Sequence, residues 1–70
     1  MSDVKIITQT DEDGNPYGTL YVGRDAILVI DRGGIHDLGR RLGSLTFDVK
    51  TVQEMDRLVK EWILTNLGGG

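Results

Sequence analysis

The sequence predicts an α+β domain in which a small antiparallel sheet of three to four strands packs against one C-terminal amphipathic helix. In the first part of the chain, short runs of apolar and β-branched residues are separated by turn residues, which is typical of strands joined by hairpins. In the last part, apolar residues recur at spacings of three and four, the period of a helix. The expected strands are 3–10, 17–23, 26–31 and 44–49, with a loop at 32–43, a helix at 52–67 and a flexible glycine tail at 68–70.

The first two strands are expected to form a hairpin. The β-branched residues of 3–10 favour a strand over a helix. The segment 11–16 contains Asp-Gly and Asn-Pro, both of which favour turns, and its three acidic residues keep the tip in water. In 17–23, Leu20 and Val22 share the opposite face from the tyrosine between them.

The third and fourth strands differ in their patterns. The segment 26–31 is apolar on both faces, which favours a central position in the sheet. The segment 32–43 is rich in glycine and arginine and is expected to be a long connection, and connections of this length are usually functional or mobile. The segment 44–49 has an apolar residue at every second position, which predicts a fourth strand or a strand-like lead into the helix.

The helix is expected to begin at a capping box formed by Thr51 and Glu54, and to end at the glycine cap Gly68. Its apolar residues cover a wider arc than the stripe of about 100° that a surface helix needs, and Leu64 lies outside that arc. This surplus of apolar surface predicts a homodimer. The alternative is a monomer whose long loop folds over the sheet through Ile35, Leu38 and Leu42. The expected dimer interface is Met55, Leu58, Trp62 and Leu64.

Composition limits the class of protein. The chain has 70 residues, no cysteine and one histidine, so we expect one domain, 1–70, without disulfides, a metal centre or a cofactor. A domain this short buries only about 60% of its unfolded surface and usually needs support, for which self-association is the remaining option. The net charge of −3 provides no general attraction to nucleic acid. The chain shows neither a secretory leader nor an apolar run of the roughly 20 residues that span a bilayer, so we expect a cytoplasmic protein.

A group of arginine, glycine and histidine residues is the most suggestive feature. Arginine presents a planar fork of donors that suits phosphate, and glycine lets the backbone approach an anion. The group therefore predicts an anion-binding or partner-binding loop. The alternative is a solvated loop in which Asp25, Asp31 and Asp37 pair with the arginines. The candidate residues are Arg24, Arg32, Gly33, Gly34, His36, Arg40 and Arg41.

Two tyrosines are candidates for stacking on unpaired bases. Tyr17 and Tyr21 lie on one predicted strand, and the alternative for them is a half-buried cross-strand contact.

The run Gly-Ser-Leu-Thr-Phe at 43–47, leading into the helix, is similar in shape to the positive-cofactor-4-type single-stranded-DNA-binding fold. That resemblance implies a curved sheet that binds the strand and a helix that dimerises. The sequence departs from the pattern in its negative net charge, its few lysines and the lack of a basic ridge on the sheet.

Nothing in the sequence forms a catalytic motif. His36 and Asp37 are adjacent on an extended segment and so point to opposite sides, and Ser44 has no nucleophile-elbow motif around it. The acidic run 11–13 lacks the later ligands of a calcium-binding loop. We therefore expect no enzyme, and an enzyme acting on a small anionic substrate would require a buried His36 beside a pocket.

These observations predict a small non-enzymatic protein-interaction module, a homodimer that acts as a regulator or inhibitor, of the kind that phages use, by binding a protein partner. The alternative is a single-stranded nucleic-acid-binding module that uses the arginine- and glycine-rich loop.

Overall fold

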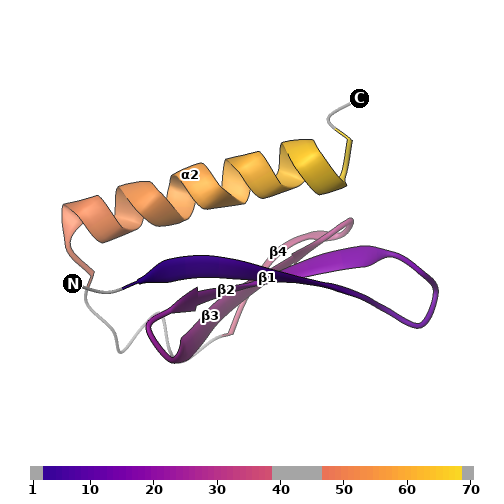
Figure 1. The fold of residues 1–70 in the computed structure, drawn as a ribbon, viewed down its shortest axis with the longest axis horizontal. Helices are drawn as coiled ribbons and strands as arrows, with labels where there is room; N and C mark the ends of the chain where they lie inside the picture. The colour runs from indigo at the N-terminus through magenta and orange to yellow at the C-terminus, as the bar shows by residue number, and fades with distance from the viewer. Residues whose placement is uncertain (1–2, 39–46, 69–70) are drawn as a thin grey trace.

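The computed structural model describes residues 3–38 and 47–68, which form a four-stranded antiparallel sheet with one helix lying across one of its faces (Figure 1). The strands lie side by side in chain order, each antiparallel to the next. This arrangement confirms the predicted α+β fold class. The elements are β1 (Val4–Thr10), β2 (Pro16–Val22), β3 (Asp25–Asp31), β4 (Gly34–Asp37) and α2 (Val49–Asn66).

The first two turns form as their residue types predict. In the β1–β2 loop, Oδ1 of Asp11 accepts hydrogen bonds from the amides of Asp13 and Asn15, each at 2.9 Å. Gly23 occupies the first central position of the two-residue β2–β3 turn with a φ of 61°. That position of a type II′ hairpin turn requires a positive φ, which glycine adopts without steric cost.

A β-bulge interrupts the pairing of β2 with β3. Leu20 is paired with Leu28, whereas Tyr21 is paired with Ala26, so Ile27 is an extra residue in β3. Ile27 is completely buried and Leu28 is 8% exposed, although they are neighbours in a strand. The bulge therefore accounts for consecutive apolar residues in β3, which lies inside the sheet as predicted.

The core lies between α2 and the sheet. The helix packs mainly over β1 and β2 and contributes Val59 and Trp62 to the buried set. The remaining buried side chains come from the two inner strands and are Leu20, Val22, Ile27, Leu28 and Ile30.

The helix begins earlier than the sequence predicts, so the expected start at 52 is wrong. Asp48 is the N-cap, and its carboxylate accepts a hydrogen bond from the amide of Thr51 at 2.8 Å. Thr51 is therefore inside the first turn instead of capping it. Glu54 forms an ion pair with Arg57 on the helix surface, so the predicted capping box does not form. The helix ends with Leu67 as its C-cap, and Gly68 follows with a φ of 78°, the left-handed conformation of a glycine cap, as predicted.

The fourth strand is not where the sequence predicts it. β4 lies within the expected loop 32–43, because Gly33 completes a tight turn that folds the chain back onto β3. The amide of Gly33 donates to Oδ1 of Asp31 at 2.7 Å. Of the predicted strand 44–49, residues 47 and 48 precede the helix and Val49 begins it, while 44–46 lie outside the described residues.

Candidate functional site

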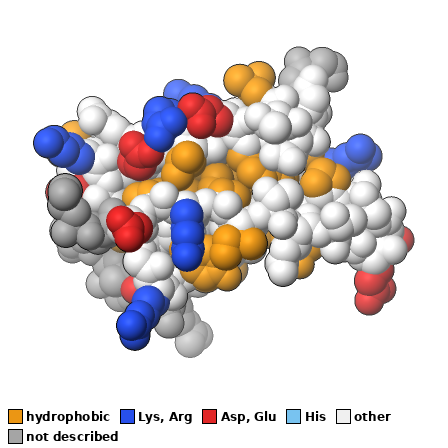
Figure 2. All heavy atoms as spheres, viewed as in Figure 1, with side chains coloured by type: hydrophobic (Ala, Val, Ile, Leu, Met, Phe, Trp, Pro, Cys, Tyr) orange, Lys and Arg blue, Asp and Glu red, His pale blue; other side chains and the backbone are white. Residues whose placement is uncertain are grey.

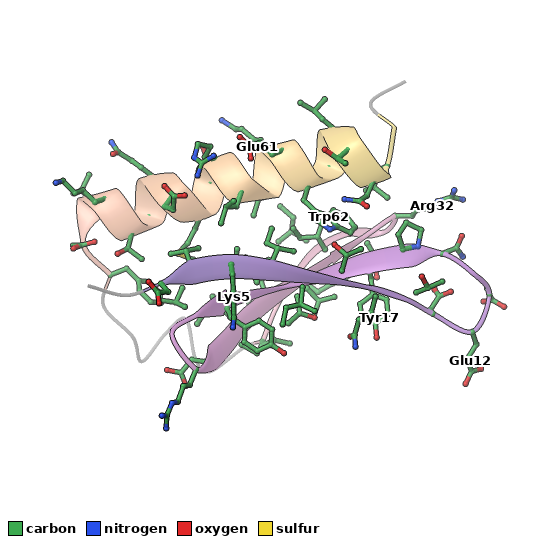
Figure 3. All side chains as sticks on the ribbon, in the orientation of Figure 1. Lys5, Glu12, Tyr17, Arg32, Glu61 and Trp62 are labelled. Carbon is green, nitrogen blue, oxygen red and sulfur yellow. The ribbon has the colours of Figure 1, made fainter. Side chains whose placement is uncertain are left out.

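The sheet has one face that α2 does not cover, and we call it the open face. Side chains alternate between the two faces of a strand, and Figure 3 shows Lys5 and Tyr17 on the side away from the helix. The strand register then places the other members on the same side. The open face consists of Lys5, Ile7, Gln9, Tyr17, Thr19, Tyr21, Ala26, Val29, Asp31 and His36.

A row of four paired residues crosses the middle of the open face. Ile7 is opposite Thr19, Thr19 is opposite Val29, and Val29 is opposite His36. Ile7 is 43% exposed, and Thr19 and Val29 are half-buried although no described element lies over them. The centre of the face therefore presents branched, mainly apolar side chains to whatever approaches it.

Tyr21 and Lys5 form a cross-strand pair at one end of the open face. They are directly opposite each other on β2 and β1, and Nζ of Lys5 lies 6.0 Å from the centre of the Tyr21 ring. That distance is at the outer limit of a cation–π contact. Tyr17 lies on the same face of β2, four residues away, or roughly 13 Å along the strand. Both predicted stacking residues are thus on the uncovered side of the sheet.

His36 and Asp31 form the polar end of the open face. They lie diagonally across the β3–β4 pair, with Nε2 of His36 3.0 Å from Oδ1 of Asp31. The hydrogen bonds from His36 and from the amide of Gly33 lower the pKa of Asp31 below its ordinary value. The His36 side chain is 54% exposed, so the buried histidine that the enzyme hypothesis requires does not form.

The two described arginines of the predicted group lie far apart. Arg24 lies in the β2–β3 turn and Arg32 in the β3–β4 turn, which are at opposite ends of β3. Seven residues of strand separate the two turns, which amounts to roughly 20 Å. Gly33 and Gly34 serve the tight turn beside Arg32. The remaining two predicted members, Arg40 and Arg41, lie outside the described residues.

Most of the predicted dimer interface on the helix belongs to the core of a single chain. Trp62 is 6% exposed, and Met55 and Leu58 are partly buried against the core. Leu64 is 68% exposed and lies away from the sheet. Val52, which the helical pattern assigns to the apolar arc, is 50% exposed.

Charged pairs occupy the outer surface of the helix, where Figure 2 shows basic and acidic side chains next to one another. Arg57 donates to Glu54 and to Glu61, and the two carboxylates raise the pKa of Arg57. Lys60 pairs with Asp56 at 2.9 Å. Such exposed pairs contribute little to the stability of the fold. They do neutralise the basic side chains of the helix, which are therefore poorly suited to binding an anion.

A groove of about 260 Å³ runs between α2 and β1. Figure 2 shows apolar side chains along this seam. The groove is smaller than the pockets that bind drug-sized ligands, which measure about 300–1,000 Å³. It is lined by Ile6, Leu58, Glu61, Trp62, Thr65 and Asn66.

The part of the chain that the structure describes contains neither a metal-binding cluster nor a membrane-spanning helix. Within 3–38 and 47–68, no three histidine, aspartate or glutamate side chains converge as a metal site would require. The one described helix, α2, has no apolar stretch long enough to cross a bilayer. Ser44, considered above as a nucleophile, lies outside the described residues.

Comparison of the chain with protein-family models, with curated proteins and with solved structures finds no match.

Proposed function

We propose that this chain is a small non-enzymatic protein-interaction module that acts as a regulator or inhibitor by docking a protein partner on the open face. The observation that carries the proposal is the one-sided packing of the sheet. The helix covers one face, while aromatic and branched side chains remain on the other with no described element over them (Figures 1 and 3). Aromatic residues are enriched where protein partners bury their contacts.

The charge distribution favours a protein partner over a nucleic acid. The two basic side chains of the open face, Lys5 and His36, lie against Tyr21 and Asp31 respectively. The centre of the face carries no charge at Ile7, Thr19 or Val29, and the chain as a whole has a net charge of −3. Phosphate binding requires several uncompensated cations along one surface.

The proposal is tested by affinity enrichment with three purified baits: the wild type, Tyr17→Ala and the helix-surface control Lys60→Ala. A partner retained by the wild type and the control but lost with Tyr17→Ala is then purified, and its dissociation constant is measured by calorimetry. We expect Tyr17→Ala to weaken binding at least about tenfold, as truncation of an interface tyrosine commonly does. A partner that responds to Lys60→Ala and not to the open-face variant would place the binding surface on the helix and refute the proposal.

A second candidate function, binding of single-stranded nucleic acid, is favoured by the position of Tyr17 and Tyr21 on one uncovered strand face with Lys5 beside them. Stacking on an aromatic side chain contributes about 1–3 kcal/mol per base. Fluorescence anisotropy with labelled single-stranded and double-stranded oligonucleotides, at low and at physiological salt, tests it. Tight binding of single strands that weakens with salt would support this function, and absence of binding at low salt would eliminate it.

A further inference from the structure

Within the residues that the structure describes, β1 is an edge of the sheet without the features that usually protect an edge. It has seven residues, contains no proline or glycine, carries one charge at Lys5, and pairs with β2 without a register shift. Protected edges are short, charged, bulged or covered. The opposite edge, β4, has only four residues and includes His36 and Asp37. An unprotected edge offers unpaired backbone groups to another strand.

Two hydrogen bonds show which backbone groups of β1 point outward. The amide of Gly23 donates to the carbonyl of Asp3 at 2.7 Å, and the amide of Asp11 donates to the carbonyl of Asn15 at 2.9 Å. Both lie in register with the β1–β2 pairing, one beyond each end of β1. Bonded and non-bonded pairs alternate along an antiparallel ladder, so the odd-numbered residues of β1 bond to β2. The groups pointing outward therefore belong to Val4, Ile6, Thr8 and Thr10.

We propose that β1 pairs with β1 of a second copy of the chain, forming a two-fold dimer with one continuous sheet of eight strands. An antiparallel register centred on Ile7 places Val4 opposite Thr10 of the second copy and Ile6 opposite its Thr8. In this register every outward-pointing residue meets another outward-pointing residue. The four bonded pairs supply about eight hydrogen bonds between the chains.

The residues of β1 suit pairing with their own copy. Ile7, which is 43% exposed, meets Ile7 of the second copy in a non-bonded pair, where Cα atoms are about 4.5 Å apart and side chains are close. Lys5 meets Gln9 of the second copy, so the only charge within β1 does not face itself. The contact therefore buries the two Ile7 side chains against each other on the two-fold axis. In a single copy, the Ile7 side chain is exposed to water.

The groove beside β1 lies on the side where the even-numbered side chains of an added strand would project. Ile6, Leu58 and Trp62 form its apolar part, and Ile6 itself belongs to the edge strand. Thr8 of the second copy is opposite Ile6, so its methyl group enters the groove of the first copy. By symmetry, Thr8 of the first copy enters the groove of the second. The dimer thus covers both the unpaired backbone and the adjoining apolar seam.

Cysteine cross-linking tests the register directly, because the chain has no native cysteine. The two-fold axis places the Cα atoms of Ile7→Cys within the 4.4–6.8 Å that a disulfide spans. In the matched variant Gln9→Cys, on the same face of the same strand, the two new thiols are separated by four residues of strand, or roughly 13 Å. On oxidation we expect Ile7→Cys to form a covalent dimer at least about tenfold faster than Gln9→Cys. Equal rates for the two variants would overturn the proposal.

A charge pair tests the same contact without covalent chemistry. Gln9→Glu places a carboxylate opposite Lys5 of the second copy twice in each dimer, whereas Gln9→Lys places like charges there. Sedimentation equilibrium at low salt should show a dimer dissociation constant about tenfold smaller for Gln9→Glu than for Gln9→Lys. A wild type that stays monomeric at several hundred micromolar, or equal constants for the two variants, would refute pairing through β1. Because the measurement uses the chain alone, its outcome is independent of partner docking on the open face.

Discussion

The indole of Trp62 on α2 lies directly against Gly18 on β2. A β-carbon placed at Gly18 would be 2.7 Å from Cε2 of Trp62 and 2.8 Å from Cγ2 of Ile6. Real β-carbons do not approach other atoms so closely, so the absence of a side chain at this position allows the helix to approach the sheet. The contact between Gly18 and Trp62 thus sets the distance between α2 and the sheet.

We expect Gly18→Ala to destabilise the fold by about 1–3 kcal/mol, the usual cost of overpacking a well-filled core. Urea unfolding followed by far-ultraviolet circular dichroism measures the change, because this signal does not require Trp62, the only tryptophan, and so also serves a variant that lacks it. Trp62→Leu in the same chain should remove part of the additional cost of Gly18→Ala, because the crowded ring is gone while the contact with Cγ2 of Ile6 remains. Independent, additive effects of the two substitutions would contradict this account.

A hydrogen bond ties the same indole to β1. Nε1 of Trp62 donates to Oγ1 of Thr8 at 2.9 Å in a partly buried setting. Thr8→Val keeps the shape of the side chain and leaves the indole N–H without this acceptor, so we expect a loss of about 1 kcal/mol. The matched variant is Thr10→Val, a substitution of the same type at an exposed position of the same strand. Thermal unfolding should show a lower midpoint for Thr8→Val than for Thr10→Val, and equal midpoints would show that the bond adds no stability.

The stability of the fold should decrease in acid because of Asp31 and Asp48. The His36 and Gly33 hydrogen bonds lower the pKa of Asp31, and the hydrogen bonds from the side chain and amide of Thr51 lower the pKa of Asp48, each from an ordinary value of 3.8. A carboxylate with a lower pKa in the folded state stabilises that state above the unfolded pKa and loses this contribution as the pH falls through the folded pKa.

Thermal midpoints measured between pH 7 and pH 2 should therefore fall mainly below about pH 4. The double variant Asp31→Asn, Asp48→Asn should show a shallower fall, while asparagine at 48 still caps the helix. If the thermal midpoint of that variant falls with decreasing pH as steeply as that of the wild type, other carboxylates cause the acid sensitivity.

The parts of the fold that sequence predicts well are those set by local chemistry. The β-branched content of β1 and the Asp-Gly turn after it define the first hairpin, and the apolar run of β3 indicates an inner strand. The bulge at Ile27 depends on how two strands twist together, which no single segment encodes. Asp48 and Thr51 both satisfy the residue preference of an N-cap, so the sequence pattern alone does not choose between them.

The candidate site was predicted only in part, for a topological reason. The even spacing of Tyr17 and Tyr21 on one strand predicts that they share a face of the sheet, and both lie on the open face. Arg24 and Arg32 are close in sequence, but successive turns of a meander lie at opposite ends of its strands, which separates them. The sequence does not indicate β4, because the glycines that follow Arg32 are typical of a loop and a strand of four residues gives only a short alternation of side chains.

Leu64 distinguishes the proposed dimer from one formed through the helix. Its side chain is 68% exposed on α2, away from the sheet, and is not among the residues that line the groove beside β1. If copies associate through β1, Leu64→Glu should leave the dimer dissociation constant within about twofold of the wild type, as is usual for a surface substitution outside a contact. Ile7→Lys should raise the constant by more than about tenfold, because two like charges would then face each other across the two-fold axis. Sedimentation equilibrium of both variants measures the difference. A dimer weakened by Leu64→Glu and insensitive to Ile7→Lys would instead place the contact on the helix.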